Sequence, residues 1–293
     1  MHQLSEKPKL SIVLGTYNRK KFLKLTIESI REEMKNFEYP FEIIVVDGGS
    51  DDGTLQWLAK QKDTVAIIQH NHGTWEGKPV QKKTWGYFMN LGFQVARGKY
   101  VCMLSDDCLV VPGSILNGYE LFENRLEQGQ KIGAVAFFWR DVPGPKKYWT
   151  GRLFNKTILV NHGIFLKKAL EEVGYIDEDV FRFYYADGDL CLRICQMGYE
   201  IIESQNSYIE HYAHANVGLR NKNAENATVD KEAFFTRWAG NIGNAVEESS
   251  HPHIKEYHDE LKTAMKFKRA RPIEFYAIKS KAKHMLKKVI RRK

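Results

Sequence analysis

Three groups of carboxylates and one pair of histidines are the residues whose types and spacing suggest chemistry. Asp106 and Asp107 are adjacent and directly follow the apolar run YVCML and Ser105. Two neighbouring carboxylates concentrate negative charge, which a hard cation such as Mg²⁺ or Mn²⁺, shared with substrate phosphates, relieves. A solvated acidic turn is the alternative interpretation of this pair.

Asp47 ends the apolar run FEIIVV and is followed by the loop GGSDDG. Glycines let a ligand approach the backbone closely, and a carboxylate here accepts hydrogen bonds from a nucleobase N–H or from ribose hydroxyls. An ordinary Asp/Gly turn that caps the next helix explains the same residues.

The segments YADGDL and SYIEHYAHAN contain the remaining candidates. Asp187 lies just before a predicted helix, and a carboxylate aimed into a cleft there deprotonates a hydroxyl nucleophile. Carboxylates are also common in first helical turns, and Asp189 in particular fits a structural cap. His211 or His214 is able to complete a metal site with an aspartate and diphosphate oxygens, whereas satisfied structural histidines are the alternative.

Apolar runs alternate with helical patterns along the first half of the chain and would position these residues. We predict strands at 10–14, 42–46 and 100–104, a helix over 20–34 and a second helix from Thr54. This alternation favours a mostly parallel sheet with helices on both faces. Ligands bind beyond the carboxyl ends of such strands, where Asp47, Asp106 and Asp107 lie.

The second half of the chain is less regular. DLCLRICQMG has the pattern of an amphipathic helix closed by Gly198, and YEIIE that of a further strand. Beyond about His214 the pattern becomes polar and helical.

Taken in order, these segments resemble glycosyltransferase family 2, inverting enzymes with the Rossmann-like nucleotide-binding fold called GT-A. LSIVLGTYNR is similar to the family's strand and P-T-Y-N-R turn, and VVDGGSDDGT to V-D-D-G-S-x-D-G-T. NLGFQVARGKYVCMLSDD resembles N-x-G-x-x-x-A-x-G-x-Y leading into the metal-binding D-x-D. EEVGYIDEDVFRFYYADGDLCLRICQMGY is similar to the later motif that carries the catalytic base. The resemblance covers roughly residues 10–215 and implies the α/β GT-A fold.

The resemblance implies a role for each residue that matches a motif. The nucleotide-sugar pocket is expected to be lined by Thr16, Tyr17, Arg19, Asp47 and Asp106. In that pocket, Tyr17 is expected near the base, Asp47 to hydrogen-bond the base, and Asp106 beside the ribose and diphosphate.

The same resemblance assigns the metal and the base. Asp107 and His211 are expected to ligate Mn²⁺ or Mg²⁺, with His211 favoured over His214 by its spacing after the strand. Asp187 matches the catalytic base. The expected reaction transfers a sugar from a nucleotide-diphosphate sugar, with inversion, to a hydroxyl acceptor such as a cell-surface glycan, a polysaccharide or a lipid-linked intermediate.

Ser105 and Ala186 depart from the family pattern. Ser105 replaces the first acid of the metal motif, so fewer carboxylates are left to hold the cation, and Ala186 replaces the glutamate that usually precedes the base. A catalytically degenerate GT-A protein that binds nucleotide or glycan without turnover is therefore the alternative.

Charge and hydropathy indicate two regions, a catalytic domain over 8–240 and a helical, basic C-terminal extension over 241–293. The net charge of +8 is concentrated in the last thirty residues. In 283–293, apolar residues recur at helical spacing among lysines and arginines, which suits an anionic membrane surface or a solvated helix end. Nucleic acid is not the expected partner, because the interior motifs are acidic.

The chain has no run of roughly 20 apolar residues and no apolar signal core at its N-terminus. We therefore expect a cytoplasmic protein, with peripheral contact to the inner face of the membrane through the basic tail. The four cysteines fit no zinc spacing and are expected to be reduced.

Overall fold

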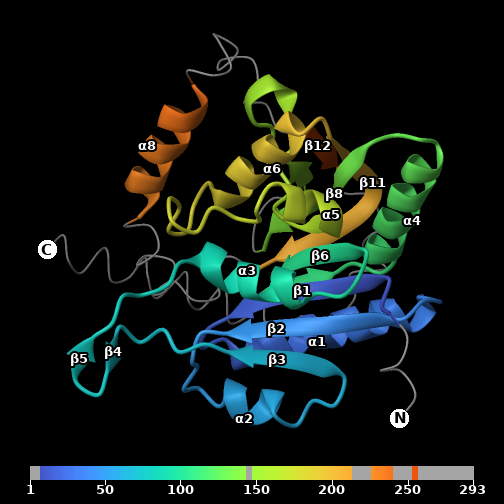
Figure 1. Cartoon of the computed structure of the whole chain (residues 1–293). Coiled ribbons are helices and arrows are strands. Elements are labelled where there is room, and N and C mark those ends of the chain that lie inside the picture. Colours follow the sequence, from blue (N-terminus) through green and yellow to red (C-terminus); the bar gives the residue numbers. More distant parts are fainter. Residues whose placement is uncertain (1–6, 143–146, 213–225, 240–252, 257–293) are drawn as a thin grey trace, which may run out of the picture.

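The computed structural model describes residues 7–142, 147–212, 226–239 and 253–256 of the 293. Its main sheet has ten strands: β1 (Leu10–Thr16), β2 (Phe41–Asp47), β3 (Thr64–Ile68), β6 (Tyr100–Ser105), β7 (Cys108–Val110), β8 (Ile132–Asp141), β9 (Lys147–Thr150), β10 (Gly163–Leu166), β11 (Glu200–His211) and β12 (His253–Glu256). A two-stranded hairpin, β4 (Thr74–Trp75) and β5 (Lys78–Pro79), extends away from this sheet (Figure 1).

Helices cover the sheet and alternate with its strands along the sequence (Figure 1). They are α1 (Lys20–Glu33), α2 (Thr54–Leu58), α3 (Trp85–Val95), α4 (Ser114–Glu127), α5 (Lys167–Glu172), α6 (Ala186–Gln196) and α8 (Ala227–Trp238), with short 3₁₀ turns η1 (Met34–Asn36) and η2 (Phe154–Lys156).

The strand order is β12-β9-β8-β10-β6-β1-β2-β3, with β11 beside β8 and β7 beside β11. Strands β6, β1, β2 and β3 are parallel to one another. Strand β10 is antiparallel to both of its neighbours, β6 and β8, and β11 runs parallel to β8. The predicted parallel sheet is thus confirmed for the first half of the chain, and the second half adds antiparallel strands to it.

Strand β1 lies inside the sheet, between β6 and β2, and its side chains are buried on both faces. Ile12 packs in one apolar cluster with Leu23 of α1, whereas Val13 packs in the opposite cluster with Phe93 of α3. This two-sided burial is typical of a parallel sheet covered by helices. A Cβ atom at Gly92 of α3 would lie 2.4 Å from Cγ1 of Val13, so only glycine allows α3 to approach β1 this closely.

The pairing register brings the carboxyl ends of three strands to one edge of the sheet. Thr16 at the end of β1 is level with Asp47 at the end of β2, and Gly15 is level with Ser105 at the end of β6. The loops that leave these strands therefore meet at one place, as expected for the ligand-binding edge of an α/β sheet.

The C-terminal region is described only in part. His253–Glu256, which we expected within a helical extension, forms β12 and pairs antiparallel with β9 of the main sheet, so the helical expectation is wrong for these four residues. The basic segment 283–293 and its predicted membrane contact lie outside the described residues. Among the described residues, every helix is too short or too polar to cross a membrane.

Candidate active site

Asp106 and Asp107 form a buried acidic pair between β6 and β7. Their exposed fractions are 4% and 3%, so the alternative of a solvated acidic turn does not hold. Nη1 of Arg19 donates to Oδ1 of Asp106 at 2.9 Å and to Oδ2 of Asp107 at 2.7 Å. The hydroxyl of Thr16 donates to Oδ2 of Asp106 at 2.7 Å. Three of the predicted pocket residues, from the ends of two adjacent strands, are thus joined directly.

The backbone of the acidic pair is held by helix α1. The Thr26 hydroxyl lies 2.9 Å from the carbonyl oxygen of Asp106 and 2.8 Å from that of Cys108. From the other side, the amide of Tyr212 donates to the carbonyl of Asp107 at 2.8 Å. These contacts preorganise the turn, so the carboxylates are presented in one fixed arrangement.

Burial and neighbouring charges move the pKa values of this pair in opposite directions. Burial raises the pKa of Asp106 to about 6, despite the opposing charge of Arg19. Burial also acts to raise the pKa of Asp107, but Arg19 and His211 outweigh it and hold that pKa well below its usual range. The burial of Arg19 is likewise outweighed by Asp107 and Asp106, which raise its pKa above the ordinary value. Asp107 is therefore the permanently ionised member of the pair.

His211, at the end of β11, lies between two carboxylates. Its Nε2 is 3.3 Å from Oδ1 of Asp107 and its Nδ1 is 3.0 Å from Oδ1 of Asp141. Burial acts to lower the pKa of His211, but Asp107 and Asp141 raise it to about 9. His214 lies outside the described residues. The structure therefore brings the two predicted metal ligands, Asp107 and His211, into contact.

These two residues fit a divalent cation. Within the described part of the chain, Oδ1 of Asp107 is buried and makes no hydrogen bond, although it faces Nε2 of His211. A buried carboxylate oxygen without a donor is costly unless a cation or proton compensates it. A carboxylate oxygen and an imidazole nitrogen are both suitable ligands for Mn²⁺.

Asp187 lies in the first turn of α6 and is connected to the strand end beside the acidic pair by two consecutive residues, Asn161 and His162. Its Oδ2 accepts a hydrogen bond from Nδ2 of Asn161 at 3.2 Å, and its Oδ1 accepts from the amide of Gly188 at 2.9 Å. His162, which follows Asn161 in the sequence, places its Nε2 3.2 Å from the hydroxyl of Ser105. Burial raises the pKa of Asp187, and the two hydrogen bonds offset part of that rise. A carboxylate with a raised pKa is suited to accept a proton.

Asp189, two residues further along α6, has a structural environment. It is completely buried and accepts hydrogen bonds from Arg193 on its own helix and from Arg237 and Trp238 of α8. Asp189 thus holds α8 against α6, so its role is structural, although it does not cap α6 as expected.

Asp47 and Tyr17 shape the loop after β2. The carboxylate of Asp47 is completely buried and accepts hydrogen bonds from the amides of Gly49 and Ser50 and from the Ser50 hydroxyl. A Cβ atom at Gly48 would lie 3.2 Å from the Tyr17 ring, which explains the tight packing of that ring on the loop. Asp47 therefore holds the loop, and the loop supports Tyr17.

Cys108, Asn161 and His162 are part of this site but were missed as site residues by sequence reasoning. His162 is completely buried beside β6, where Sγ of Cys108 lies 3.1 Å from its Nε2. Burial and the nearby His211 lower the pKa of His162 to about 3, so its ring is neutral. The one available signal was His162, which stands immediately before the apolar run GIF. Its place in the site could be predicted only with the knowledge that β10 pairs with β6.

Comparisons with known proteins find relatives of the sequence and of the fold. The sequence profile described as glycosyl transferase family 2 matches residues 11–162. Chondroitin synthase of Pasteurella multocida is 32% identical over 107 residues, which cover 35% of this chain and 10% of that protein. An uncharacterized glycosyltransferase of Methanocaldococcus jannaschii is 30% identical over 193 residues, covering 60% of this chain and 62% of that protein. This chain thus spans a tenth of the first relative and less than two thirds of the second.

Solved structures show the same fold. The mannosyltransferase PcManGT from Pyrobaculum calidifontis, in complex with GDP-Man and Mn²⁺, superposes with a TM-score of 0.55 at 18% identity over 95% of this chain and 76% of that one. S. aureus TarS 1–349 superposes with a TM-score of 0.51 at 16% identity over 93% of this chain and 87% of that one. These likenesses confirm the predicted GT-A arrangement.

Proposed function

The chain belongs to glycosyl transferase family 2, and from that premise we propose that it transfers a sugar from a nucleotide-diphosphate sugar to a hydroxyl of its acceptor, with inversion at the anomeric carbon. The observation that carries this proposal is the link from Asp187 through Asn161 and His162 to the acidic end of β6. Through these contacts Asp187, whose pKa burial raises, is connected to the carboxylate pair where the cation and the leaving diphosphate are proposed to bind.

The donor is assigned to the loops at the carboxyl ends of β1, β2 and β6. Arg19 and Thr16 already contact Asp106 there, so a nucleoside diphosphate entering this edge meets an ordered set of donors and acceptors. Tyr17 offers its face to the base. Asp47 accepts three hydrogen bonds within its own loop. Because a carboxylate has about four lone-pair sites, it stays a predicted acceptor for a base N–H.

Asp107 and His211 are proposed to hold Mn²⁺ or Mg²⁺. When bound, such a cation supplies Lewis-acid stabilisation of the charge on the leaving diphosphate. The Mn²⁺ and GDP-Man found with PcManGT, which shares this fold, support that choice of cofactor and donor class. Arg19 adds a fixed positive charge at the same place, because its guanidinium donates to both carboxylates.

Asp187 is proposed to remove the proton from the acceptor hydroxyl as that oxygen attacks the anomeric carbon. Burial favours the protonated product of this step, and the contacts from Asn161 and Gly188 keep the carboxylate oriented for it. One base suffices, because a diphosphate leaving group needs charge stabilisation more than protonation, unlike the leaving group of a glycoside hydrolase.

The acceptor is proposed to be a cell-surface glycan, a polysaccharide or a lipid-linked intermediate. The chondroitin synthases of Pasteurella multocida and Escherichia coli, which match about a third of this chain, support a polysaccharide most directly. Cytoplasmic location and contact between the basic C-terminus and an anionic membrane stay predictions, since that segment lies outside the described residues.

The proposal is tested by nucleotide release from a panel of UDP-, GDP- and dTDP-sugars in Mn²⁺, Mg²⁺ or EDTA. Transfer to water is a slow reaction of many transferases. One donor is therefore expected to release its nucleotide without an acceptor when Mn²⁺ or Mg²⁺ is present, and not in EDTA. A protein that binds one donor but releases no nucleotide, even with metal and candidate acceptors, would instead be the degenerate binding protein suggested by Ser105 and Ala186.

A further inference from the structure

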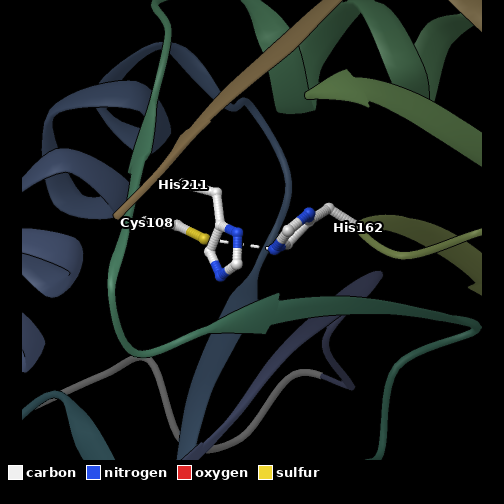
Figure 2. A group of neighbouring side chains, drawn as sticks. All are labelled: Cys108, His162 and His211. Atoms are coloured by element: carbon white, nitrogen blue, oxygen red, sulfur yellow. Dashed lines mark hydrogen bonds between the residues drawn. The ribbon is translucent and has the colours of Figure 1, made fainter. Parts of the chain in front are cut away.

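Cys108, His162 and His211 bring one sulfur and two imidazoles together under the acidic pair. They come from β7, from the residue before β10 and from the end of β11, and their ligand atoms lie within 4.8 Å of one another. Figure 2 shows Cys108 and His162 facing each other along the dashed contact, with the ring of His211 drawn across that line. The donor, cation and base roles proposed above make no use of Cys108, and His162 enters them only through its contact with Ser105.

The cluster contains groups that lack a conventional partner. Sγ of Cys108 is 3.1 Å from Nε2 of His162, and the rings of His162 and His211 are 5.4 Å apart. Within the described residues, Oδ1 of Asp107 makes no hydrogen bond, although it lies 3.3 Å from Nε2 of His211. Cys108 and His162 are buried, whereas His211 is half-buried. The cluster thus combines a buried carboxylate oxygen that makes no hydrogen bond with one sulfur and two imidazoles.

This donor set matches a different class of cation from Mg²⁺. Thiolate and imidazole select Zn²⁺ and similar ions, whereas Mg²⁺ requires oxygen ligands in an octahedron. In a tetrahedral zinc site with bonds of about 2.0–2.3 Å, the ligand atoms lie roughly 3.3–3.7 Å apart. The ligand atoms of Cys108, His162 and His211 lie within 4.8 Å of one another, so these three residues require side-chain shifts of about an ångström or less to reach that geometry.

We propose that Cys108, His162 and His211 bind a thiophilic divalent cation of the Zn²⁺ class, with Oδ1 of Asp107 as the fourth ligand. Binding displaces the thiol proton of Cys108 and any proton on His211 to solvent, and both imidazoles coordinate as neutral rings. The contact between Cys108 and His162 is replaced by two bonds to the metal.

The site shares His211 and Asp107 with the cation proposed for catalysis. If the proposed function holds, the two metals exclude each other, and Zn²⁺ inhibits turnover that Mn²⁺ supports. The departure at Ser105 fits this sharing, because a serine hydroxyl that contacts His162 stands where the family has a carboxylate for a hard cation.

The proposal is tested by titrating the full chain with Co²⁺, without donor, and recording its absorption spectrum. Wild type is expected to develop a thiolate-to-Co²⁺ charge-transfer band at one equivalent that Zn²⁺ removes. Cys108→Ser is expected to lose the band. Its affinity for Zn²⁺ is expected to fall by more than roughly 100-fold, because loss of a group that only supports a ligand already costs about 10- to 100-fold. Cys195→Ser is the matched control, because Cys195 lies on α6 outside the cluster.

A second measurement needs no variant and so does not depend on folding of Cys108→Ser. X-ray absorption of the Zn²⁺-loaded wild type is expected to show one sulfur at about 2.3 Å together with nitrogen and oxygen ligands. A first shell without sulfur, or a Co²⁺ band that persists in Cys108→Ser, would overturn the proposal. Both readouts are independent of turnover, so they separate the metal site from the proposed transferase activity.

Discussion

Nδ2 of Asn161 donates a 3.2 Å hydrogen bond to Oδ2 of Asp187, and it is this contact that connects the base on α6 with the strand ends that hold the acidic pair. Asn161 precedes His162, which contacts Ser105 on β6, so two consecutive residues join two halves of the site that are about eighty residues apart in sequence. The position of the base is therefore set by the loop before β10.

The same contact predicts how activity depends on pH. A base must be ionised, so kcat/KM should fall as pH falls through the pKa of Asp187, which burial raises above the ordinary value of 3.8. Asn161 stabilises the ionised form, so Asn161→Ala should raise that pKa further and move the acidic limb to higher pH by about one unit. A pH–rate profile of donor turnover checks this. An acidic limb that stays in place, or moves to lower pH, would show that Asn161 does not act on the base.

Substitutions of Asp187 and Asp189 should affect different properties, catalysis for Asp187 and stability for Asp189. Asp189→Ala leaves Arg193, Arg237 and Trp238 without their buried acceptor and should lower the free energy of unfolding by about 3–5 kcal/mol. Asp187→Asn is isosteric and keeps an acceptor for Gly188, so it should change stability by less than about 1 kcal/mol. Urea unfolding followed by fluorescence measures both; equal losses would contradict the division of roles.

Arg19 should compensate the acidic pair whenever the cation is absent. Arg19→Ala leaves Asp106 with the Thr16 hydroxyl and Asp107 with His211, and it should cost about 3–5 kcal/mol in EDTA. Mn²⁺ should then raise the melting temperature of this variant more than that of wild type, because the cation replaces the lost charge. Arg97→Ala is the control, since Arg97 pairs with Glu42 at the amino end of the sheet. A Mn²⁺ shift no larger than that of wild type would argue against a cation at Asp107 and His211.

Local patterns in the sequence sufficed for the elements that begin the site. The predicted strands at 10–14, 42–46 and 100–104 are confirmed as β1, β2 and β6, because each is an apolar run buried on both faces. Because β1 and β6 are parallel neighbours, Thr16 and Asp106 had to meet at their carboxyl ends, and they do. The helix opening at Thr54 and the helix closed by Gly198 are also found.

Contacts made by tertiary pairing were beyond the sequence. Cys108 and His162 are 54 residues apart and meet only because β10 lies antiparallel to β6, which no local period reveals. The cysteines show no zinc spacing in the sequence, and the two histidines proposed to act with Cys108 lie far from it along the chain. The dual contact of Arg19 was likewise unforeseen, since the acidic pair alone suggested a metal as its compensating charge.

The most direct test of the proposed transferase is Asp187→Asn, assayed for donor binding and for turnover in parallel. Calorimetry with the donor found in the panel should give a Kd within about twofold of wild type, because Asp187 acts on the acceptor rather than on the nucleotide. Metal-dependent transfer should fall by roughly 10²–10⁴-fold, the usual contribution of a general base. Turnover that remains near the wild-type level, with binding intact, would contradict the assignment of Asp187 as the base and with it the central claim.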